Sequence, residues 1–508
     1  MMLPNNTADF LLAGKPPDRV ALRLLDGDFT YGDLSDASSE FASRLVNNGA
    51  AQGDRVIMLS GNSFHWVAAY LGILRAGMVC VPLPGTLSAQ DLAYMVVHTE
   101  ARLAFVQNQI AMKHAPTLAQ FGVTMFRESE NRASCYFEGT VSVKPQSPTV
   151  FPEVASSDLA ALMFTSGSTG TPRGVMVSHR NIMANTNSII EALSLQENDR
   201  MMVVLPFHYC FGTSLLHTYL RVGAMLVIDP RFMYPEVVVQ QIQETECTSF
   251  AGVPSHYQIL LRNSSLTKRS FPRLHSLLQP GVHLAVSLLQ ELQRTLPQTR
   301  IFVMYGQTEA TARLSCLPPE ALASKLGSIG KAIPGVTLHV ITESGCDAAP
   351  GEIGEIVAEG DNITRGYWRA PEETANTFRD GRLYTGDLAK VDEDGFLYVV
   401  DRAKEFIKCG GIRTSCRQIE DSLLEYADLL EVAVVGVPDD VLGEAVRAFV
   451  VPRSSERDRF EERLRQFCKA KLARSFYPRD VVVVNTLPKN SSGKVLRAQL
   501  KNVKIGAH

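Results

Sequence analysis

Residues 165–175 read TSGSTGTPRGV and directly follow the apolar run LAALMF at 159–164. Glycines let backbone N–H groups converge on an anion, hydroxyl side chains donate further hydrogen bonds, and Arg173 supplies positive charge. The segment therefore predicts a phosphate-binding loop. It is not a Walker A loop, because no Gly-Lys-Ser/Thr follows its glycines. A flexible surface linker is the alternative, since runs of this composition are common in linkers.

Outward from this loop, the chain alternates helical and strand-like segments. Helical periodicity covers 34–48 and 65–76, and apolar strand candidates lie at 55–59, 201–205, 224–228, 301–304 and 355–357. This alternation predicts an α/β fold in which helices layer over mostly parallel sheets. The stretch 134–157 is richer in Ser, Pro and Thr, and we expect a loop or an edge hairpin there.

The pattern starts again after about residue 400. The polar run 401–405 separates two strand-like segments at 396–400 and 406–408, and a helix at 418–426 and a strand at 432–437 follow. We expect a large N-terminal domain over residues 1–401 and a small mobile C-terminal α/β domain over 402–508.

Composition restricts the class of protein and of partner. The 508 residues are 45% hydrophobic and 20% charged, with a formal net charge of −3. That balance predicts a soluble globular protein with a small-molecule partner and argues against nucleic acid. Nine cysteines without a C-x-x-C pair predict neither a disulfide framework nor a zinc site. No apolar run is long enough to span a membrane and no secretory leader is recognisable, so we expect a cytoplasmic protein.

Further segments follow the glycine loop in a fixed order. They are LPFHYCFG (205–212), YGQTEA (305–310), GEIGEI (351–356), YTGDLA (384–389), DRAKEFIKCGG (401–411) and PKNSSGKVLR (488–497). In order and spacing they resemble the adenylate-forming superfamily, which includes acyl-CoA synthetases, peptide-synthetase adenylation domains and firefly-type luciferases. The resemblance implies that a carboxylate attacks the α-phosphate of ATP, pyrophosphate leaves and an acyl adenylate remains. It also implies Mg²⁺, and coenzyme A or carrier-protein phosphopantetheine as the thiol.

The resemblance assigns a nucleotide site. Tyr305 and Gly306 would line the adenine slot, Thr308 would contact the α-phosphate, and Asp387 with Arg402 would hold the ribose, although a lone Asp after Gly is usually a turn residue. The implied ATP-binding set is Thr165, Ser166, Gly167, Ser168, Thr169, Gly170, Arg173, Gly281, Tyr305, Gly306, Gln307, Thr308, Asp387, Arg402 and Lys494.

The resemblance also implies catalytic residues and a conformational cycle. Lys494, Thr308 and Glu309 would be catalytic, with Glu309 and Thr165 holding Mg²⁺. Taken alone, Glu309 is equally well a solvated residue at a helix start, and Lys494 a surface charge. Lys404 would be the hinge, and the thiol path would pass Lys408, Gly410 and Gly411. Without a thiol, the two glycines are simply a tight turn.

The sequence departs from the pattern in four places. Arg173 stands where a lysine is usual, and Tyr209 where many relatives have histidine, with His208 before it. Val282 replaces the second of two glycines, and Ser415-Cys416 replaces Ser-Pro. These departures affect the predicted acyl site, which comprises Tyr209, Gly212, Val253 and Val282. Arginine keeps the charge of lysine but binds phosphate through a planar fork, so we expect altered adenylation and not its loss.

The acid and its acceptor are less constrained. No acidic residue lies at 211–216 to pair with an ammonium group, so we expect a fatty or other apolar carboxylic acid. Coenzyme A is the simpler acceptor. An acyl or peptidyl carrier protein acting in trans is the alternative, with a basic cluster at Arg463, Arg465, Lys469, Lys471 and Arg474 that a solvated helix face explains equally well. A catalytically silent nucleotide-binding homologue and a luciferase-like oxidase stay open as further alternatives.

Overall fold

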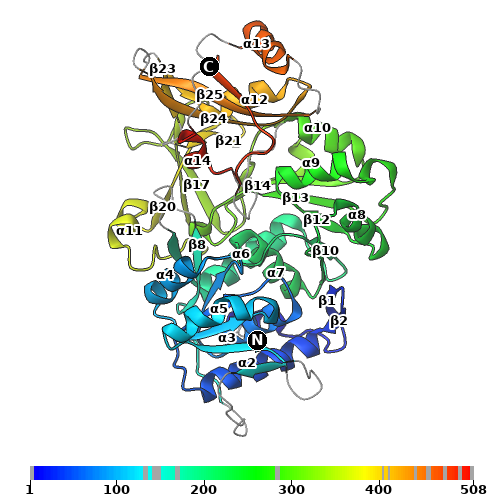
Figure 1. The fold of residues 1–508 in the computed structure, drawn as a ribbon, viewed down its shortest axis with the longest axis vertical. Helices are drawn as coiled ribbons and strands as arrows, with labels where there is room; N and C mark the ends of the chain where they lie inside the picture. Colours follow the sequence, from blue (N-terminus) through cyan, green and yellow to red (C-terminus); the bar gives the residue numbers. More distant parts are fainter. Residues whose placement is uncertain are drawn as a thin grey trace.

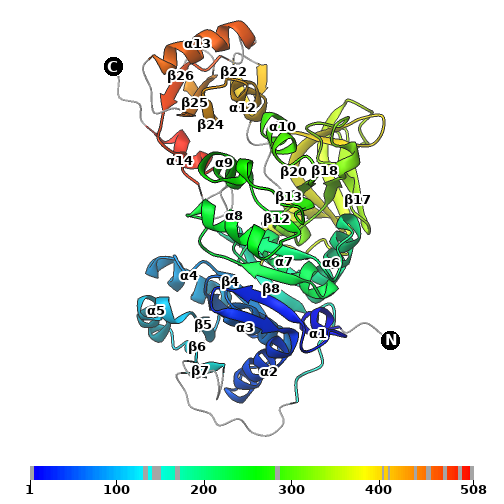
Figure 2. The ribbon, with the colours of Figure 1, turned by 90° about the vertical axis from the view of Figure 1, so that its right-hand side faces the viewer.

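A computed structural model of the chain describes residues 5–129, 136–139, 150–165, 172–280, 286–402, 406–409, 412–439, 443–453, 459–472, 477–489 and 495–503. The N-terminal elements form the lower part of the molecule in both views, and the C-terminal elements from β22 onward form a smaller unit at its upper end (Figures 1 and 2). Within the described residues, no helix combines the length and apolarity needed to cross a membrane.

The first sheet has seven strands in the order β7-β6-β5-β3-β4-β8-β9. Its central pairs are parallel, and β7 and β9 join at the two edges as antiparallel strands. The strands are β3 (Arg55–Leu59), β4 (Val79–Leu83), β5 (Leu103–Val106), β6 (Thr124–Glu128), β7 (Phe137–Gly139), β8 (Leu159–Thr165) and β9 (Arg173–Ser178). The helices are α1 (Thr7–Leu12), α2 (Tyr31–Asn47), α3 (Phe64–Arg75), α4 (Ala89–Thr99) and α5 (Asn108–Gln120). Within 134–157 the structure describes the edge strand β7, whose antiparallel partner β6 lies before that stretch, so the edge hairpin begins earlier than expected.

The second sheet has nine strands in the order β16-β15-β14-β13-β12-β10-β11-β1-β2. Five consecutive pairs, from β14 to β1, are parallel. The strands are β1 (Val20–Leu24), β2 (Gly27–Thr30), β10 (Arg200–Val203), β11 (Met225–Ile228), β12 (Ser249–Ala251), β13 (Ser276–Pro280), β14 (Arg300–Tyr305), β15 (Ser315–Leu317) and β16 (Lys331–Ala332). The helices are α6 (His179–Leu193), α7 (Cys210–Val222), α8 (Pro235–Glu244), α9 (Pro254–Asn263) and α10 (Val286–Thr295).

The third sheet is antiparallel throughout. It contains β17 (Val336–Ile341), β18 (Ile353–Gly360), β19 (Phe378–Arg379), β20 (Arg382–Val391) and β21 (Leu397–Arg402), with α11 (Pro371–Thr377) beside it. The strand expected at 355–357 therefore exists, but it belongs to an antiparallel sheet. Parallel pairing is confined to the segments that helices connect, because two parallel strands need a long crossover between them. Strands that are joined by short turns pair antiparallel.

The C-terminal unit combines a small sheet with three helices. Its strands are β22 (Phe406–Cys409), β23 (Ile412–Ser415), β24 (Leu429–Asp439), β25 (Gly443–Pro452) and β26 (Asp480–Val483), and its helices are α12 (Cys416–Leu424), α13 (Phe460–Lys471) and α14 (Arg497–Lys501). Ser415 is the N-cap of α12 and accepts a hydrogen bond from the Gln418 N–H, so Cys416 is the first helical residue. A proline is also well tolerated at that position, which explains how Ser-Cys can replace Ser-Pro without changing the helix start.

The core explains why α3 is so apolar. Its residues from Phe64 to Leu74 are all buried, as expected for a helix that is covered on every side. Trp66 and Tyr70 stack with ring centroids 5.2 Å apart, and Trp66 also contacts the Phe207 ring. Both large sheets contribute to this cluster, which fixes the start of α7 against the first sheet.

Candidate active site

The predicted phosphate loop joins two paired strands. Thr165 ends β8 and lies opposite Arg173, the first residue of β9, in an antiparallel register. The intervening residues 166–171 lie outside the described part of the chain. Ser178 at the end of β9 caps α6, and the Asn181 side-chain oxygen accepts a hydrogen bond from the Ser178 backbone N–H. The base of the loop is therefore held by a strand pair and a capped helix.

A second loop leaves β14 at Tyr305 and contains the YGQTEA segment. A Cβ atom on Gly306 would lie 2.0 Å from the Ala312 carbonyl oxygen, so only glycine fits there. Thr308–Ala310 form a short 3-10 turn, which ends at Thr311 with φ of +66°. This is a strained conformation for a β-branched residue, and such strain concentrates at functional sites. The Thr308 hydroxyl donates to the Cys210 sulfur at 3.3 Å and so fixes the turn to the start of α7.

Tyr367 links Glu309 to the base of the phosphate loop. The Tyr367 hydroxyl donates to the Glu309 carboxylate at 2.8 Å, and the Arg173 guanidinium lies 5.4 Å from the centre of the Tyr367 ring. The 366–368 segment runs along β9, with the Trp368 N–H donating to the Gly174 carbonyl at 2.7 Å. Burial and the nearby Glu309 carboxylate both raise the pKa of Tyr367, which stays a hydrogen-bond donor at neutral pH. One tyrosine side chain thus contacts both a cation, at its ring, and a carboxylate, at its hydroxyl.

Asp387, on β20, is held by two donors from other strands, Tyr305 on β14 and Arg402 on β21. The Tyr305 hydroxyl donates to one carboxylate oxygen at 2.7 Å, and the Arg402 Nε donates to the other at 3.1 Å. Asp387 and Tyr305 are each only 6% exposed, whereas the Arg402 side chain is 44% exposed. Burial, followed by the Asp387 charge, raises the pKa of Tyr305 well above its ordinary value, so the hydroxyl keeps its proton.

The start of α7 contains most of the described residues of the predicted acyl site. Tyr209 is the N-cap of α7, and its ring centre lies 4.3 Å from that of His208. A Cβ atom on Gly212 would lie 2.1 Å from the Pro206 carbonyl oxygen, so close backbone packing requires glycine at this position. Val253 is the buried N-cap of α9. Burial raises the pKa of the Cys210 thiol, which therefore stays protonated at neutral pH.

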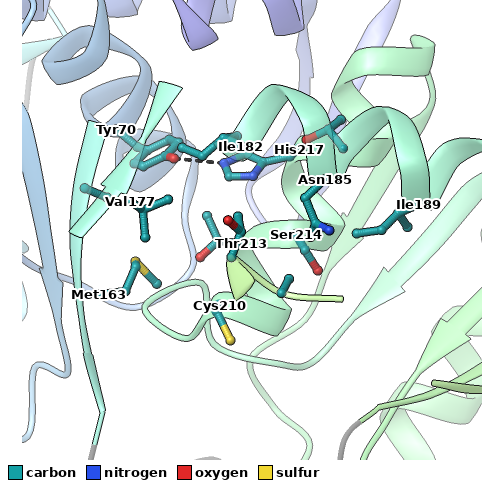
Figure 3. Close-up of a pocket in the computed structure, with 14 residues that line it drawn as sticks. Tyr70, Met163, Val177, Ile182, Asn185, Ile189, Cys210, Thr213, Ser214 and His217 are labelled. Carbon is teal, nitrogen blue, oxygen red and sulfur yellow. Dashed lines mark hydrogen bonds between the residues drawn. The ribbon is translucent and has the colours of Figure 1, made fainter. Parts of the chain in front are cut away.

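A small cavity of about 20 Å³ lies behind this turn, between α3, α6, α7 and the β8–β9 pair (Figure 3). Cys210, Thr311 and Ala312 form the end nearest the 3-10 turn. At the other end the Tyr70 hydroxyl and the His217 Nε2 are 2.8 Å apart (Figure 3). Burial lowers the pKa of His217 to about 3, so the imidazole is neutral. The main polar side chains of the wall already have partners, which makes this cavity a poor recognition site for a polar ligand.

Two functional candidates were missed by the sequence analysis. Tyr367, which holds Glu309, follows a glycine in a loop and carries no local signal. Arg313 lies only four residues after Glu309 and is 3% exposed. A charged residue close to a recognised motif was a signal that could have identified it.

Several predicted site residues lie outside the described part of the chain. They are Ser166, Gly167, Ser168, Thr169, Gly170, Gly281, Val282, Lys404, Gly410, Gly411 and Lys494, together with the side chain of Lys408. Of the described residues, the structure brings Thr308 against the start of α7, Glu309 close to Arg173, and Asp387 against Tyr305 and Arg402. Gln307 immediately precedes the 3-10 turn and makes no side-chain capping hydrogen bond to it.

The described residues fit a nucleotide with a divalent cation. Asp387 is an acceptor-only carboxylate, suited to a pair of sugar hydroxyls. Across residues that the structure describes, no group of three or more His, Cys, Asp or Glu side chains could form a metal cage. Glu309 is a carboxylate of the kind that binds Mg²⁺ together with phosphate oxygens and water.

Comparisons with known proteins agree with this geometry. The model of the AMP-binding enzyme family matches residues 12–368, and that of the AMP-binding enzyme C-terminal domain matches residues 418–494. The long-chain-fatty-acid–CoA ligase of Bacillus subtilis is 29% identical, with 98% of this chain and 94% of that protein covered. The 2-succinylbenzoate–CoA ligase of Bacillus licheniformis is 31% identical, with 95% and 97% covered.

A solved structure extends the similarity to three dimensions. The O-succinylbenzoate coenzyme A synthetase MenE of Bacillus subtilis, in complex with ATP and magnesium ion, superposes with a TM-score of 0.84 at 27% identity, with 97% of this chain and 99% of that chain covered. The expected mixed α/β architecture with a separate C-terminal unit is therefore confirmed. The chain belongs to the AMP-binding enzyme family and is an adenylate-forming acid–thiol ligase.

Proposed function

We propose that this ligase activates a carboxylic acid with Mg-ATP at the site between β8–β9, the 305–311 loop and β20, and then transfers the acyl group to coenzyme A. The observation that carries the proposal is the pair of carboxylates, Glu309 and Asp387, each held by a tyrosine hydroxyl. Glu309 adjoins the base of the phosphate loop through Tyr367, and Asp387 is bonded to Tyr305, the residue before Gly306. Two carboxylates at two different places suit the phosphates and the nucleoside of one ATP molecule.

The proposed roles follow from charge and hydrogen-bonding capacity. Asp387 accepts hydrogen bonds from the ribose hydroxyls, and Arg402 orients that carboxylate. Arg173 balances phosphate charge beside the loop of Thr165, and Thr308 donates to the α-phosphate. Glu309 holds the cation, whose charge neutralises phosphate oxygens when it is bound.

The remaining steps are assigned to residues outside the described part of the chain. Lys494 would bring positive charge to the substrate carboxylate and the α-phosphate as the two anions approach. Lys404 would act as the hinge, with the domain boundary between residues 401 and 402, and Gly410–Gly411 would line the thiol path. The separate sheets that contain β21 and β22 support a boundary slightly later, between Arg402 and Phe406, because β21 includes Arg402.

The acid is proposed to have an apolar body and no ammonium group. Residues 211–216 include no carboxylate, and the buried Arg313 guanidinium next to Phe211 would repel a cation. The relatives named above act, by their names, on a long-chain fatty acid and on 2-succinylbenzoate, which is consistent with such an acid.

Coenzyme A is favoured over a carrier protein as the acceptor. The basic cluster on α13 would have to meet an acidic carrier, but Arg465 pairs with Glu461 at 2.9 Å and Arg463 lies 3.9 Å from Asp428. Charges that are already paired contribute less to a protein interface.

The test is pyrophosphate release with Mg-ATP across fatty, aryl and amino acids, with coenzyme A present or absent and Lys494→Ala as the control. Release that requires one acid class and Lys494, and that rises with coenzyme A, is the expected result. If pyrophosphate release responds to a phosphopantetheinylated carrier protein but not to coenzyme A, the acceptor is the carrier protein and not coenzyme A. No release with any acid would contradict the proposal.

A further inference from the structure

Arg313 is a buried cation beside the start of α7. Its residue is 3% exposed, and its guanidinium carbon lies 3.9 Å from the centre of the Phe211 ring. Burial lowers the pKa of the Arg313 guanidinium to about 9, so the group remains charged at neutral pH. Because charged groups are costly to bury, such a residue is expected to have an anionic partner.

No such partner exists among the residues that the structure describes. Among the described residues, the guanidinium makes one hydrogen bond, from Nε to the Met304 sulfur at 3.4 Å, and the titratable neighbours that act on it are the thiols of Cys210 and Cys316, with no carboxylate among them. The two terminal nitrogens have no hydrogen-bond acceptor in this part of the chain. Stacking on Phe211 is a favourable cation–π contact, but it satisfies none of the N–H donors.

The backbone of Arg313 is held firmly in place. Its N–H donates to the Asn185 Oδ1 at 3.1 Å, and its carbonyl accepts from the Asn185 amide at 2.9 Å and from the Asn362 amide at 3.0 Å. The hydrogen-bonded backbone and the stacked side chain together hold the guanidinium in place in the absence of a ligand. That is the arrangement expected of a preorganised recognition group.

The neighbouring segment contains a second buried polar atom without a partner. His208 lies three residues before Phe211, and its Nε2 is buried with no hydrogen bond among the described residues. Burial lowers the pKa of His208 to about 4, so the ring is neutral and offers a hydrogen bond rather than a charge. Arg313 and His208 are thus two polar groups beside the start of α7 that have nitrogens without a hydrogen-bond partner among the described residues.

We propose that Arg313 binds a second anionic group, a carboxylate at the far end of the acid that is activated, so that the preferred substrate is a dicarboxylic acid with an apolar body. This inference rests on the proposed function, since it refines the acid of that reaction. Arginine is suited to this role because its planar fork binds a carboxylate through two parallel hydrogen bonds. Arg313 would then determine specificity, without taking part in the chemical step.

The position of Arg313 favours the acid over the nucleotide as the source of this anion. Arg313 stacks on Phe211 at the start of α7, where the acyl site is proposed. The groups proposed for the sugar are Asp387, Tyr305 and Arg402, and none of them contacts the Arg313 side chain. A phosphate of ATP is the other possible source, and the experiment separates the two.

The test compares matched acids on the full-length protein. Pyrophosphate release with Mg-ATP is measured for hexanedioic against hexanoic acid, octanedioic against octanoic acid, and terephthalic against benzoic acid. The variants are Arg313→Met, which keeps much of the length without the charge, and Arg313→Lys, which keeps the charge without the fork. Arg221→Met is the matched control, because Arg221 also stacks on a phenylalanine ring, at 4.3 Å, but at the opposite end of α7.

The unmodified protein is expected to prefer one of the dicarboxylic acids, and Arg313→Met to raise the KM for that acid by about 10- to 100-fold, as for a lost hydrogen-bonded charge pair. The KM for the matching monocarboxylic acid should change by less than about threefold. Arg313→Lys should fall in between, and Arg221→Met should leave the ratio unchanged. The thermal midpoint of Arg313→Met should not fall, because replacing an unpaired buried charge by an apolar group is often stabilising.

Three results would overturn the inference. An equal loss for both members of a pair, with a lower thermal midpoint, would mean a structural role. A rise only in the KM for ATP would assign the guanidinium to a phosphate. Activation of the monocarboxylic acids with no effect of Arg313→Met would refute the inference while the proposed function stands, whereas no release with any pair by the unmodified protein would count against both.

Discussion

Removing the Tyr367 hydroxyl should weaken the binding of Mg²⁺ more than it affects any other property of the reaction. In Tyr367→Phe the Glu309 carboxylate loses the hydrogen bond of 2.8 Å that orients it, while the ring, and its contact with Arg173, can remain. A hydrogen bond to a charged group contributes about 1.5–3 kcal/mol. Glu309 is only half-buried, so water can partly replace the lost donor and the lower end of this range applies.

The expected effect is therefore a rise of about tenfold in the free Mg²⁺ concentration that gives half-maximal activity, since about 1.4 kcal/mol corresponds to a factor of ten. The assay is the initial rate of pyrophosphate release at saturating acid and ATP over a series of free Mg²⁺ concentrations. Tyr367 acts through Glu309 and is a positioning residue, so the shift in Mg²⁺ dependence is the informative reading, and a lower rate alone is not.

Tyr305→Phe is the matched control, because it removes a tyrosine hydroxyl from the other carboxylate. The bond from Tyr305 to Asp387 is 2.7 Å long, and both residues are nearly buried, so the loss should be larger, about 10- to 100-fold. It should appear in the KM for ATP, with the Mg²⁺ dependence unchanged. If both variants shifted the same parameter, or if Tyr367→Phe lowered the rate at every Mg²⁺ concentration by one factor, the separate roles of the two carboxylates would be refuted.

Two further predictions concern the framework of the site. Gly306→Ala should abolish activity and lower the thermal midpoint, because the new Cβ would lie 2.0 Å from the Ala312 carbonyl oxygen. Gly61→Ala is the control and should change neither property, because the atom nearest to its Cβ is 3.7 Å away. An active Gly306→Ala protein would contradict the turn geometry. Burial lowers the pKa of His179 to about 4 while its Nδ1 accepts from the Thr7 N–H, so the unfolded chain, with an ordinary pKa near 6.5, gains a proton first as the pH falls. The contribution of the neutral His179 to the free energy of unfolding is complete above about pH 6.5. It is lost between there and pH 4 at about 1.4 kcal/mol per pH unit. Urea unfolding at pH 7 and pH 5 should show that the free energy of unfolding falls less with pH in His179→Gln than in the unmodified protein. An equal fall in both proteins would refute this role of His179.

Much of the fold could be predicted from the sequence, because its signals are local. The helix expected at 65–76 is α3 at Phe64–Arg75, and the strand expected at 301–304 lies within β14 at Arg300–Tyr305. Pairing direction is not local, since it depends on how strands are connected in space. The strand at 355–357 was correctly recognised, yet its antiparallel sheet was not predicted.

The candidate site was predicted in part for the same reason. Motifs identified Glu309 and Asp387 separately, but Tyr367 is 58 residues from Glu309, and Tyr305 is 82 residues from Asp387. Only the fold brings these pairs together. Arg313 shows the converse, because a charged residue in an apolar stretch was visible in the sequence, whereas its burial and its lack of a partner required the structure.

The central claim is that this chain makes an acyl adenylate and passes the acyl group to coenzyme A. The most direct measurement is a single turnover, in which an excess of protein is mixed with Mg-ATP and an activated acid and the products are followed by mass spectrometry. The account predicts acyl-AMP and pyrophosphate without a thiol, and acyl-CoA with equimolar AMP after coenzyme A is added. Formation of ADP in place of AMP, or an acyl adenylate that coenzyme A does not consume, would contradict it.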